Sequence, residues 1–157
     1  MTGVNVMPCG PDRADEVHEL TQIVYADYAA LDPPSGAVRE TVERVRDDLA
    51  AGGGAIAELD GRVVGCLRWQ IGEGGDLHVR RLAVTPELQR RGIGRALMTW
   101  AEEEAKRRGC GGVFVGARLE VPRNVAFYRA LGYEAVRERS HDGYERPTWL
   151  ELRKPVS

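Results

Sequence analysis

The 157-residue sequence lacks several features that would assign it to a specialised class of protein. It has no apolar run of the roughly 20 residues that span a membrane, which excludes a transmembrane helix. Residues 1–10 contain no basic stretch followed by an apolar one, so we expect no signal peptide. The three cysteines, Cys9, Cys66 and Cys110, are odd in number and widely spaced, which favours free thiols in a reducing compartment. We therefore expect a cytoplasmic protein.

Metal-binding patterns and an excess of positive charge are also missing. There is no Cys-x-x-Cys pair and the three histidines are scattered, so we expect no metal site. The net charge of −2 argues against nonspecific nucleic-acid binding, and we expect neither nucleic acid nor membrane as a partner. Lysine is scarce, with 2 Lys against 20 Arg. Genomic base composition accounts for such a bias, although arginine also recognises phosphate and carboxylate groups with a fixed fork of donors.

The remaining composition is that of a globular protein, with 43% hydrophobic and 29% charged residues. The length suits a single domain over residues 1–157. Hydrophobic periodicity predicts an α/β (mixed α+β) fold, with a mostly antiparallel central sheet and helices on both faces. Predicted strands cover residues 4–8, 55–59, 62–69, 76–84, 113–117, 133–139 and 148–152. Predicted helices cover 13–29, capped by Asp12 or Asp15, then 37–50, about 93–108, and 124–131, capped by Asn124.

The segment Gln89-Arg90-Arg91-Gly92-Ile93-Gly94-Arg95-Ala96-Leu97 is the most informative one. It lies between the strand-like run Leu82-Ala83-Val84 and a long amphipathic helix. The first N–H groups of a helix have no partner within it and carry partial positive charge, which makes this junction an anion site. A P-loop would need Lys-Ser or Lys-Thr after the second glycine, and a dinucleotide fingerprint would need a third small residue where Leu97 stands. Neither condition is met.

The spacing instead resembles the acetyl-CoA loop of the GNAT acetyltransferase superfamily. A second block, Asn124-Val125-Ala126-Phe127-Tyr128-Arg129-Ala130-Leu131-Gly132-Tyr133, is similar to the late motif of that superfamily. The resemblance covers about residues 54–153. It implies a sheet that splays open between the strands over 76–84 and 113–117, leaving a wedge for the pantetheine arm of coenzyme A.

The resemblance further implies acetyl-CoA as the acetyl donor and a primary amine of a small molecule or peptide as the acceptor. Direct, sequential transfer requires no covalent enzyme intermediate. Main-chain groups of the Leu82-Ala83-Val84 strand would pair with the pantetheine arm, and the loop would bind the pyrophosphate. The implied donor-binding residues are Leu82, Ala83, Val84, Gln89, Arg90, Arg91, Gly92, Ile93, Gly94, Arg95, Ala96, Asn124 and Tyr128.

Acetyl transfer needs an acid for the leaving thiolate and a base for the amine. Tyr128 is the candidate acid because a phenol is protonated at neutral pH, although a buried aromatic of the core is the simpler role for a tyrosine. His78 stands where the resemblance implies a base. Glu73, Asp76 and water are alternatives, as is a histidine without a catalytic role. Under strict alternation Asp76, His78 and Arg80 share one face of their strand, and a bulge would shift this phase.

The acceptor site is expected in the first half of the chain and on strands near the cleft. The candidate residues are Tyr25, Tyr28, Arg68, Arg80 and Arg118, together with Trp69 and the break over residues 32–36 that begins at Asp32. A solvated strand edge is the simpler role for any single arginine. An arginine there would favour an acceptor that carries a carboxylate or phosphate beside its amine. An acyl-CoA-binding sensor without catalytic activity is the alternative function, and a homodimer is compatible with the resemblance.

Overall fold

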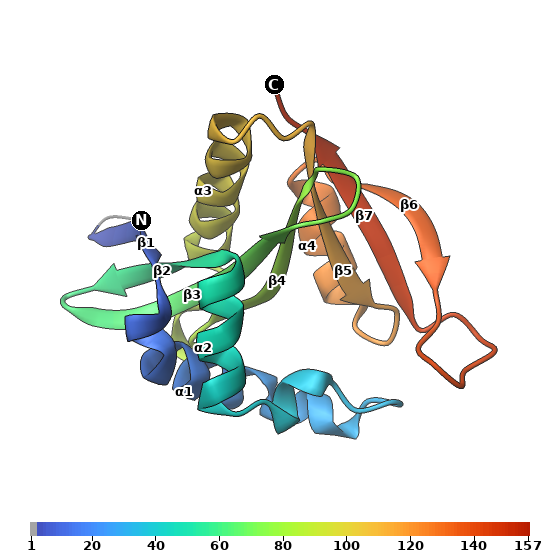
Figure 1. Ribbon diagram of the computed structural model, residues 1–157. Helices are drawn as coiled ribbons and strands as arrows, with labels where there is room; N and C mark the ends of the chain where they lie inside the picture. The colour runs from blue at the N-terminus through green and yellow to red at the C-terminus, as the bar shows by residue number, and fades with distance from the viewer. Residues whose placement is uncertain (1–2) are drawn as a thin grey trace.

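The computed structural model describes residues 3–157, and its centre is one seven-stranded sheet (Figure 1). The spatial order is β1-β2-β3-β4-β5-β7-β6, with five antiparallel neighbours and one parallel pair, β4 with β5. The strands are β1 (Val4–Cys9), β2 (Gly53–Leu59), β3 (Arg62–Ile71), β4 (Leu77–Val84), β5 (Gly112–Arg118), β6 (Glu134–Arg139) and β7 (Trp149–Pro155). The predicted mixed, mostly antiparallel sheet is confirmed.

Four α-helices cover the two faces of this sheet. They are α1 (Ala14–Tyr25), α2 (Val42–Ala51), α3 (Ile93–Arg107) and α4 (Pro122–Ala130). Short 3-10 turns are η1 (Pro11–Arg13), η2 (Ala26–Ala30), η3 (Gly36–Arg39) and η4 (Pro86–Leu88). Helices α1 and α2 pack with Ile56, Cys66 and Ala83 on one face, while α3 and α4 share the larger core on the other face. No helix within residues 3–157 combines the length and the apolar character needed to cross a membrane.

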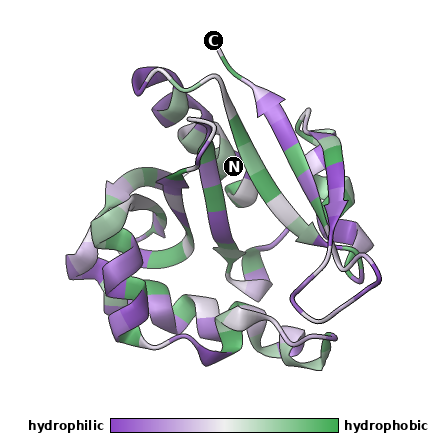
Figure 2. Ribbon diagram, turned by 45° about the vertical axis from the view of Figure 1, so that its right-hand side comes forward, coloured by the Kyte–Doolittle hydropathy of each residue, from purple (hydrophilic) through white to green (hydrophobic). Residues whose placement is uncertain are grey.

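Alternating strand residues divide the apolar side chains between core and surface. In β7, Leu150 and Leu152 are buried while Trp149, Glu151 and Arg153 between them are partly exposed. Figure 2 shows this alternation along the strand that ends near the C-terminus. The period of two follows from the pleat of an extended strand, which points successive side chains to opposite faces.

Several predicted helix boundaries are wrong. Helix α1 ends at Tyr25 and continues as the 3-10 turn η2, and neither Asp12 nor Asp15 caps it, since its N-cap is Arg13 without a side-chain bond. The second helix begins at Val42, not near residue 37, because the Thr41 side chain accepts a hydrogen bond from the Arg44 amide and caps it there. Residues 36–39 form η3, which leads into the capped helix.

A bulge interrupts the pairing of β3 with β4. Cys66 pairs with Ala83 and Arg68 pairs with Arg80, so Arg81 and Leu82 together oppose the single residue Leu67. Arg81 has a positive φ of 55°. The extra residue reverses the alternation, because Leu77 and Val79 face the α3 side whereas Ala83 faces the α1 side.

Strands β4 and β5 pair only at their beginnings. The register contains Leu77 with Val113 and His78 with Phe114, and no further pair is formed. The two strands diverge beyond this point, as Figure 1 shows. The predicted splay is therefore present, and it leaves the inner edge of β4 unpaired from Val79 to Val84.

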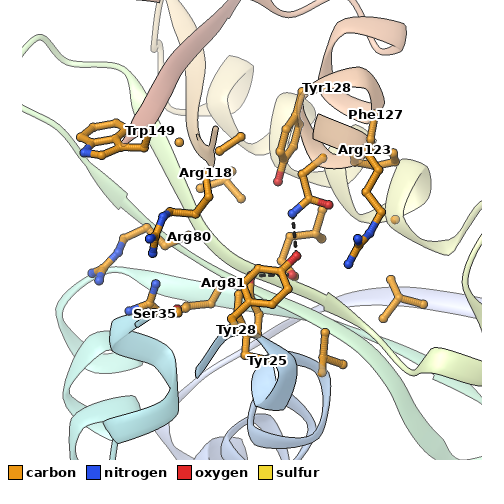
Figure 3. Close-up of a pocket in the computed structure, with 18 of the residues that line it drawn as sticks. Tyr25, Tyr28, Ser35, Arg80, Arg81, Arg118, Arg123, Phe127, Tyr128 and Trp149 are labelled. Atoms are coloured by element: carbon orange, nitrogen blue, oxygen red, sulfur yellow. Dashed lines mark hydrogen bonds between the residues drawn. The ribbon is translucent and has the colours of Figure 1, made fainter. Parts of the chain in front are cut away.

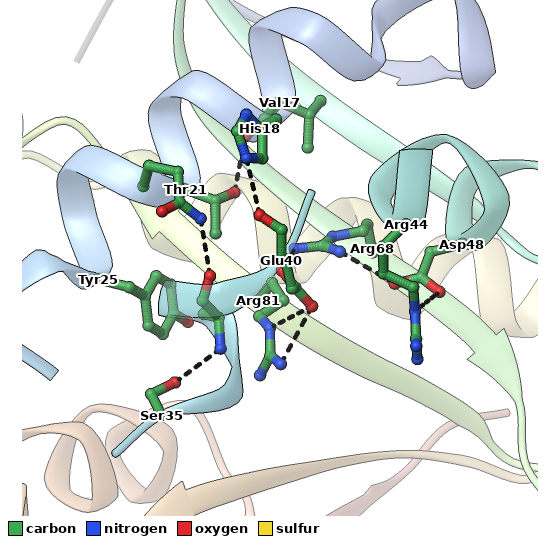
Figure 4. A network of polar contacts seen from close by, with 12 residues as sticks. Val17, His18, Thr21, Tyr25, Ser35, Glu40, Arg44, Asp48, Arg68 and Arg81 are labelled. Carbon is green, nitrogen blue, oxygen red and sulfur yellow. Dashed lines mark hydrogen bonds and ion pairs between the residues drawn. The ribbon is translucent and has the colours of Figure 1, made fainter. Parts of the chain in front are cut away.

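A buried ion cluster fixes the segment before α2 against the sheet (Figure 4). Arg68 is 2% exposed, and its guanidinium donates to Glu40 at 2.8 Å and to Asp48 at 3.0 Å. Arg81, from the bulge, donates to the second oxygen of Glu40 at 3.1 Å. The Glu40 carbonyl oxygen also lies 3.0 Å from a ring nitrogen of His18 on α1. Glu40 thus connects two strands and a helix.

We expect Glu40→Ala to lower the free energy of unfolding by about 3–5 kcal/mol, because the buried Arg68 and the partly buried Arg81 lose the carboxylate that they share. Urea denaturation measures the loss. The exposed Glu43 is the matched control, and Glu43→Ala is expected to change stability by less than about 0.5 kcal/mol. Equal effects of the two substitutions would contradict a structural role for the cluster.

Candidate functional site

A cleft of about 840 Å³ opens where β4 and β5 diverge. Its walls come from β4, β5 and α4, and its lining extends to the loop before α3 and to the segment around Ser35. Figure 3 shows a hydrogen bond between Asn124 and the Tyr28 hydroxyl near its middle, with Arg123 and Phe127 on one side and Arg80, Arg118 and Trp149 on the other. The cleft therefore has two distinct halves.

One half ends at the N-terminus of α3. Arg90 and Gly92 have positive φ values of 66° and 87°, and Gly92 is the N-cap of the helix. The first helical hydrogen bond runs from the Ala96 amide to the Gly92 carbonyl, so the amides of residues 93–95 have no acceptor within the helix. These amides and the Arg90 and Arg95 guanidiniums make this end suited to an anion.

The predicted donor residues divide between the cleft and the core. Those that line the cleft are Leu82, Val84, Gln89, Arg90, Gly92, Gly94, Arg95, Asn124 and Tyr128. Ile93 is 1% exposed and packs in the core beneath α3, and Ala83 packs against the α1 and α2 side. Arg91 and Ala96 are likewise absent from the lining. Side chains at these four positions are therefore outside the cleft, and only their main-chain groups could serve a ligand.

Gly94 is required by a close approach between α3 and α4. A Cβ atom at this position would lie 3.2 Å from the Phe127 ring. Both residues line the cleft, so a side chain at Gly94 would push into the wall that faces the loop. The glycine spacing in the sequence thus reflects packing as well as access to the helix amides.

Tyr128 lies between the two halves. Its ring is 9% exposed and packs edge-on against Phe127 and Tyr133, with centroids 5.2 Å and 5.8 Å away. Its hydroxyl makes no hydrogen bond to residues 3–157, and Figure 3 shows it pointing into the cleft. Burial, with smaller effects of Tyr25 and Tyr28, raises the pKa of the phenol. Tyr128 therefore keeps its proton at neutral pH.

Tyr25 and Tyr28 form the floor beneath Tyr128. Their rings meet edge-on with centroids 4.9 Å apart. The Tyr25 hydroxyl donates to the Leu82 carbonyl at 2.9 Å, and the Tyr28 hydroxyl accepts from the Asn124 amide at 2.7 Å. The prediction that Asn124 caps its helix is wrong, because α4 begins at Pro122 with Val121 as N-cap. Asn124 instead joins α4 to the floor of the cleft.

Two main-chain carbonyls near the unpaired edge of β4 accept hydrogen bonds from side chains. The Leu82 carbonyl accepts from Tyr25, and the Val84 carbonyl accepts from the Gln89 side chain at 3.0 Å. A carbonyl oxygen has two lone pairs, so each retains capacity for a second donor. The edge is therefore polar and only partly satisfied.

His78 lines the cleft and stacks on Phe114, with ring centroids 4.2 Å apart and planes 10° from parallel. Burial, and then the charges of Arg80 and Arg81, lower the pKa of His78 to about 4. The imidazole is therefore neutral at pH 7, which leaves a lone pair available to accept a proton.

The carboxylates considered as alternatives to His78 lie outside the cleft. Asp76 accepts two hydrogen bonds from Arg153, at 2.6 Å and 3.1 Å, and this partner lowers the pKa of Asp76. Glu73 is exposed in the loop between β3 and β4. No Asp or Glu belongs to the lining that residues 3–157 provide.

The second half of the cleft contains two of the three arginines expected at an acceptor site. Arg80 and Arg118 line it, whereas Arg68 is buried in the Glu40 cluster, so its expected place at the cleft is wrong. Trp69 is a core residue and Asp32 bonds to Tyr144 and Arg146, away from the lining. Ser35, in the break expected to wall the acceptor site, does line the cleft. Sequence reasoning missed Arg81, Arg123, Phe127, His141 and Trp149 as lining residues. Arg123 and Phe127 could have been found, since they flank Asn124 and Tyr128 in the late motif.

The described part of the chain holds no group of three His, Cys, Asp or Glu side chains able to bind a metal ion. The cleft is therefore built from arginines, aromatic rings and main-chain groups. This combination suits a ligand with a phosphate-bearing end and an uncharged arm that lies along a strand.

Residues 17–133 match the acetyltransferase (GNAT) family. The chain belongs to this family. The match spans the glycine loop and the block from Asn124 to Tyr133, the two segments that meet at the cleft. An uncharacterized N-acetyltransferase of Chlorobaculum tepidum is 29% identical over 99 residues, which cover 63% of this chain. The aligned part spans 57% of that relative, little more than half its length.

Solved structures with low sequence identity share the fold. The ribosomal-protein-S18-alanine N-acetyltransferase of Escherichia coli has a TM-score of 0.78 at 18% identity, covering 98% of this chain and 94% of its own. Ard1 of Thermoplasma volcanium has a TM-score of 0.79 at 14% identity, covering 99% of both chains. The PaiA N-acetyltransferase of Thermoplasma acidophilum, solved with coenzyme A, has a TM-score of 0.78 at 16% identity over 98% and 99% of the two chains.

Proposed function

We propose that this protein transfers an acetyl group from acetyl-CoA to a primary amine. The observation that carries the proposal is a single cleft that runs from the free amides of α3, past the unpaired edge of β4, to the Tyr128 hydroxyl. Family membership supports acetyl transfer in general. The acceptor and the roles of individual residues are part of the proposal.

Several features support acetyl-CoA as the donor. The pyrophosphate would lie at the amides of residues 93–95, with the Arg90, Arg95 and Arg123 guanidiniums around it. The pantetheine arm would follow the edge of β4 at Leu82 and Val84, as an added strand does. A protein of the same fold from Thermoplasma acidophilum was solved with coenzyme A.

Direct transfer is supported by the positions of the cysteines. None of Cys9, Cys66 and Cys110 lines the cleft, so no thiol among residues 3–157 is available there as a nucleophile. Burial raises the pKa of Cys9 to about 12 and that of Cys66 to about 11, which keeps both as unreactive thiols. We therefore propose that the acceptor nitrogen attacks the thioester carbonyl carbon itself, after which the carbon–sulfur bond breaks.

Tyr128 is the proposed acid for the departing thiolate. The phenol would donate its proton to the sulfur as the carbon–sulfur bond breaks, and recover one from solvent afterwards. Desolvation raises the pKa of Tyr128 and would also raise that of a thiol in the cleft, which favours a protonated sulfur in the product. His78, or water near it, is the proposed acceptor of the amine proton.

A screen for release of the CoA thiol tests the function. Acetyl-CoA is incubated with amino acids, polyamines, aminoglycosides and peptides with free N-termini, and the thiol is measured. Release that depends on an amine supports the transferase. Tight binding of acetyl-CoA by calorimetry without release for any amine would instead favour the acyl-CoA sensor.

Gly92→Glu is expected to abolish acetyl-CoA binding, because it sets a negative charge against the pyrophosphate. Its matched control is Gly92→Gln, which has nearly the same size and the same backbone strain at a φ of 87°. No heavy atom lies within 4 Å of a Cβ at Gly92, so both variants should fold. Calorimetry should show at least about tenfold weaker binding for Glu than for Gln. Equal affinities would refute the loop assignment.

Tyr128→Phe is expected to lower kcat by about 10²–10⁴ while leaving the KM for acetyl-CoA nearly unchanged, since only the proton donor is lost. Steady-state kinetics measure both constants. Tyr133→Phe is the control, because this substitution removes a hydroxyl that bonds Glu102 outside the cleft. A rate for Tyr128→Phe equal to that of the control would remove Tyr128 as the acid.

His78→Ala is expected to shift the acidic limb of the pH profile of kcat/KM. The pKa of His78 is lowered to about 4, so protonation below that pH would remove the base in the wild type. His78→Asn, which retains a polar side chain, should show the same shift. Profiles that superimpose on the wild type would point to water or another base.

A further inference from the structure

The arginines beside the cleft outnumber the carboxylates that neutralise them. Arg68, Arg80 and Arg81 come from two adjacent strands, and Arg68 pairs with Arg80 in the register. Their carboxylate partners are Glu40 and Asp48. Arg68 and Arg81 bond to these two carboxylates, and the exposed Arg44 also bonds to Asp48. The guanidiniums of the cluster therefore outnumber its carboxylates.

Arg80 carries that excess. It is half-buried and lines the cleft, and it has no hydrogen bond or ion pair with any residue from 3 to 157. Burial, and then the charge of Arg81, lower the pKa of Arg80. A guanidinium held partly desolvated beside other cations gains more from an anion than one in water does.

The lining of this half contains a second arginine and no carboxylate. Arg118 is fixed there by donating to the Pro33 carbonyl at 2.5 Å and to Glu120 at 3.0 Å, and its Nε atom is buried without a partner. Neither Glu120 nor any other carboxylate of the described residues lines the cleft. A polycationic amine would therefore find no carboxylate in the lining to pair with, and it would lie beside the unpaired charge of Arg80.

Arg80 also lies away from the end of the cleft at the N-terminus of α3, where the pyrophosphate of the donor is proposed to bind. Figure 3 shows Arg80, Arg118 and Trp149 on the side of the Tyr28–Asn124 hydrogen bond opposite Arg123 and Phe127. The α3 amides, Arg90 and Arg95 already supply the cations for a donor pyrophosphate at the other end. An anion at Arg80 must therefore belong to a second molecule in the cleft.

We propose that the acceptor is an amine that also carries an anionic group, a carboxylate or a phosphate, and that Arg80 binds this group. The inference rests on the proposed transferase function and names its substrate class. The anion at Arg80 would orient the acceptor so that its nitrogen points toward the middle of the cleft, where Tyr128 lies. Polyamines and other polycationic amines are excluded from efficient use.

Matched pairs of acceptors test this directly. With saturating acetyl-CoA, kcat/KM is measured for free α-amino acids and their carboxamides, and for amino phosphates and the corresponding amino alcohols. We expect the anionic member of at least one pair to exceed its neutral partner by about 10–100-fold, as for a charge-assisted hydrogen bond. The two arms distinguish a carboxylate from a phosphate. Neutral members that match or exceed the anionic ones in every pair would overturn the proposal.

Substitution of Arg80 links the preference to the residue. Arg80→Gln should reduce the anionic-to-neutral ratio by about 10-fold or more, and Arg80→Lys should retain part of it. Arg62→Gln is the control, because it removes one positive charge from an exposed position outside the cleft. Two results would overturn the assignment of Arg80 to the acceptor anion. One is an anionic-to-neutral ratio that is unchanged in Arg80→Gln, and the other is an unchanged ratio with a loss of affinity for acetyl-CoA.

Failure of the transferase function remains distinguishable from failure of this inference. If no amine leads to release of CoA, binding of the same matched pairs of probes to the CoA-bound protein is measured by calorimetry instead. Binding of an anionic probe that Arg80→Gln abolishes supports the anion site even without catalysis. No binding of any anionic probe to the wild type overturns it.

Discussion

The rest of the structure depends on the end of pairing between β4 and β5 after two residues, Leu77 and His78. A strand that loses its neighbour exposes main-chain groups whose burial without a partner is costly. Here the Tyr25 hydroxyl donates to the Leu82 carbonyl and the Gln89 side chain donates to the Val84 carbonyl. Each carbonyl oxygen can still accept a second hydrogen bond. The opening is thus a polar edge between two apolar layers, and a strand-like ligand arm can complete it.

The bulge at Arg81 determines which side chains face this opening. Without the extra residue, Arg80 and Leu82 would continue on one face of β4 and Ala83 on the other. Arg80 lies just before the bulge and lines the cleft, whereas the bulge turns Arg81 to Glu40 and directs Leu82 toward the α3 side. One inserted residue therefore separates an arginine that bonds to Glu40 from an unpaired arginine at the adjacent position.

Local patterns predicted the fold better than they predicted the site. The two strands predicted over 55–59 and 62–69, and the strand, loop and helix around Gly92, depend on neighbouring residues, and the structure has them near the expected positions. The placement of Arg68 depends on Glu40 and Asp48, which are 28 and 20 residues away, and no short-range pattern reports such pairing. Asn124 shows the same limit, because its partner Tyr28 lies 96 residues away.

The arginines of this chain differ in their burial and in their hydrogen-bond partners, and these differences determine which of them line the cleft. The cleft gathers Arg80, Arg81, Arg90, Arg95, Arg118 and Arg123, although the net charge of the protein is −2. A concave, low-dielectric surface of one sign concentrates the field and draws ligands of opposite sign. The arginines near α3 and Arg80 lie on opposite sides of the Tyr28–Asn124 hydrogen bond, so the positive charge is distributed over both halves of the cleft. Under the proposed function, one half would attract the anionic donor and the other an anionic group of the acceptor.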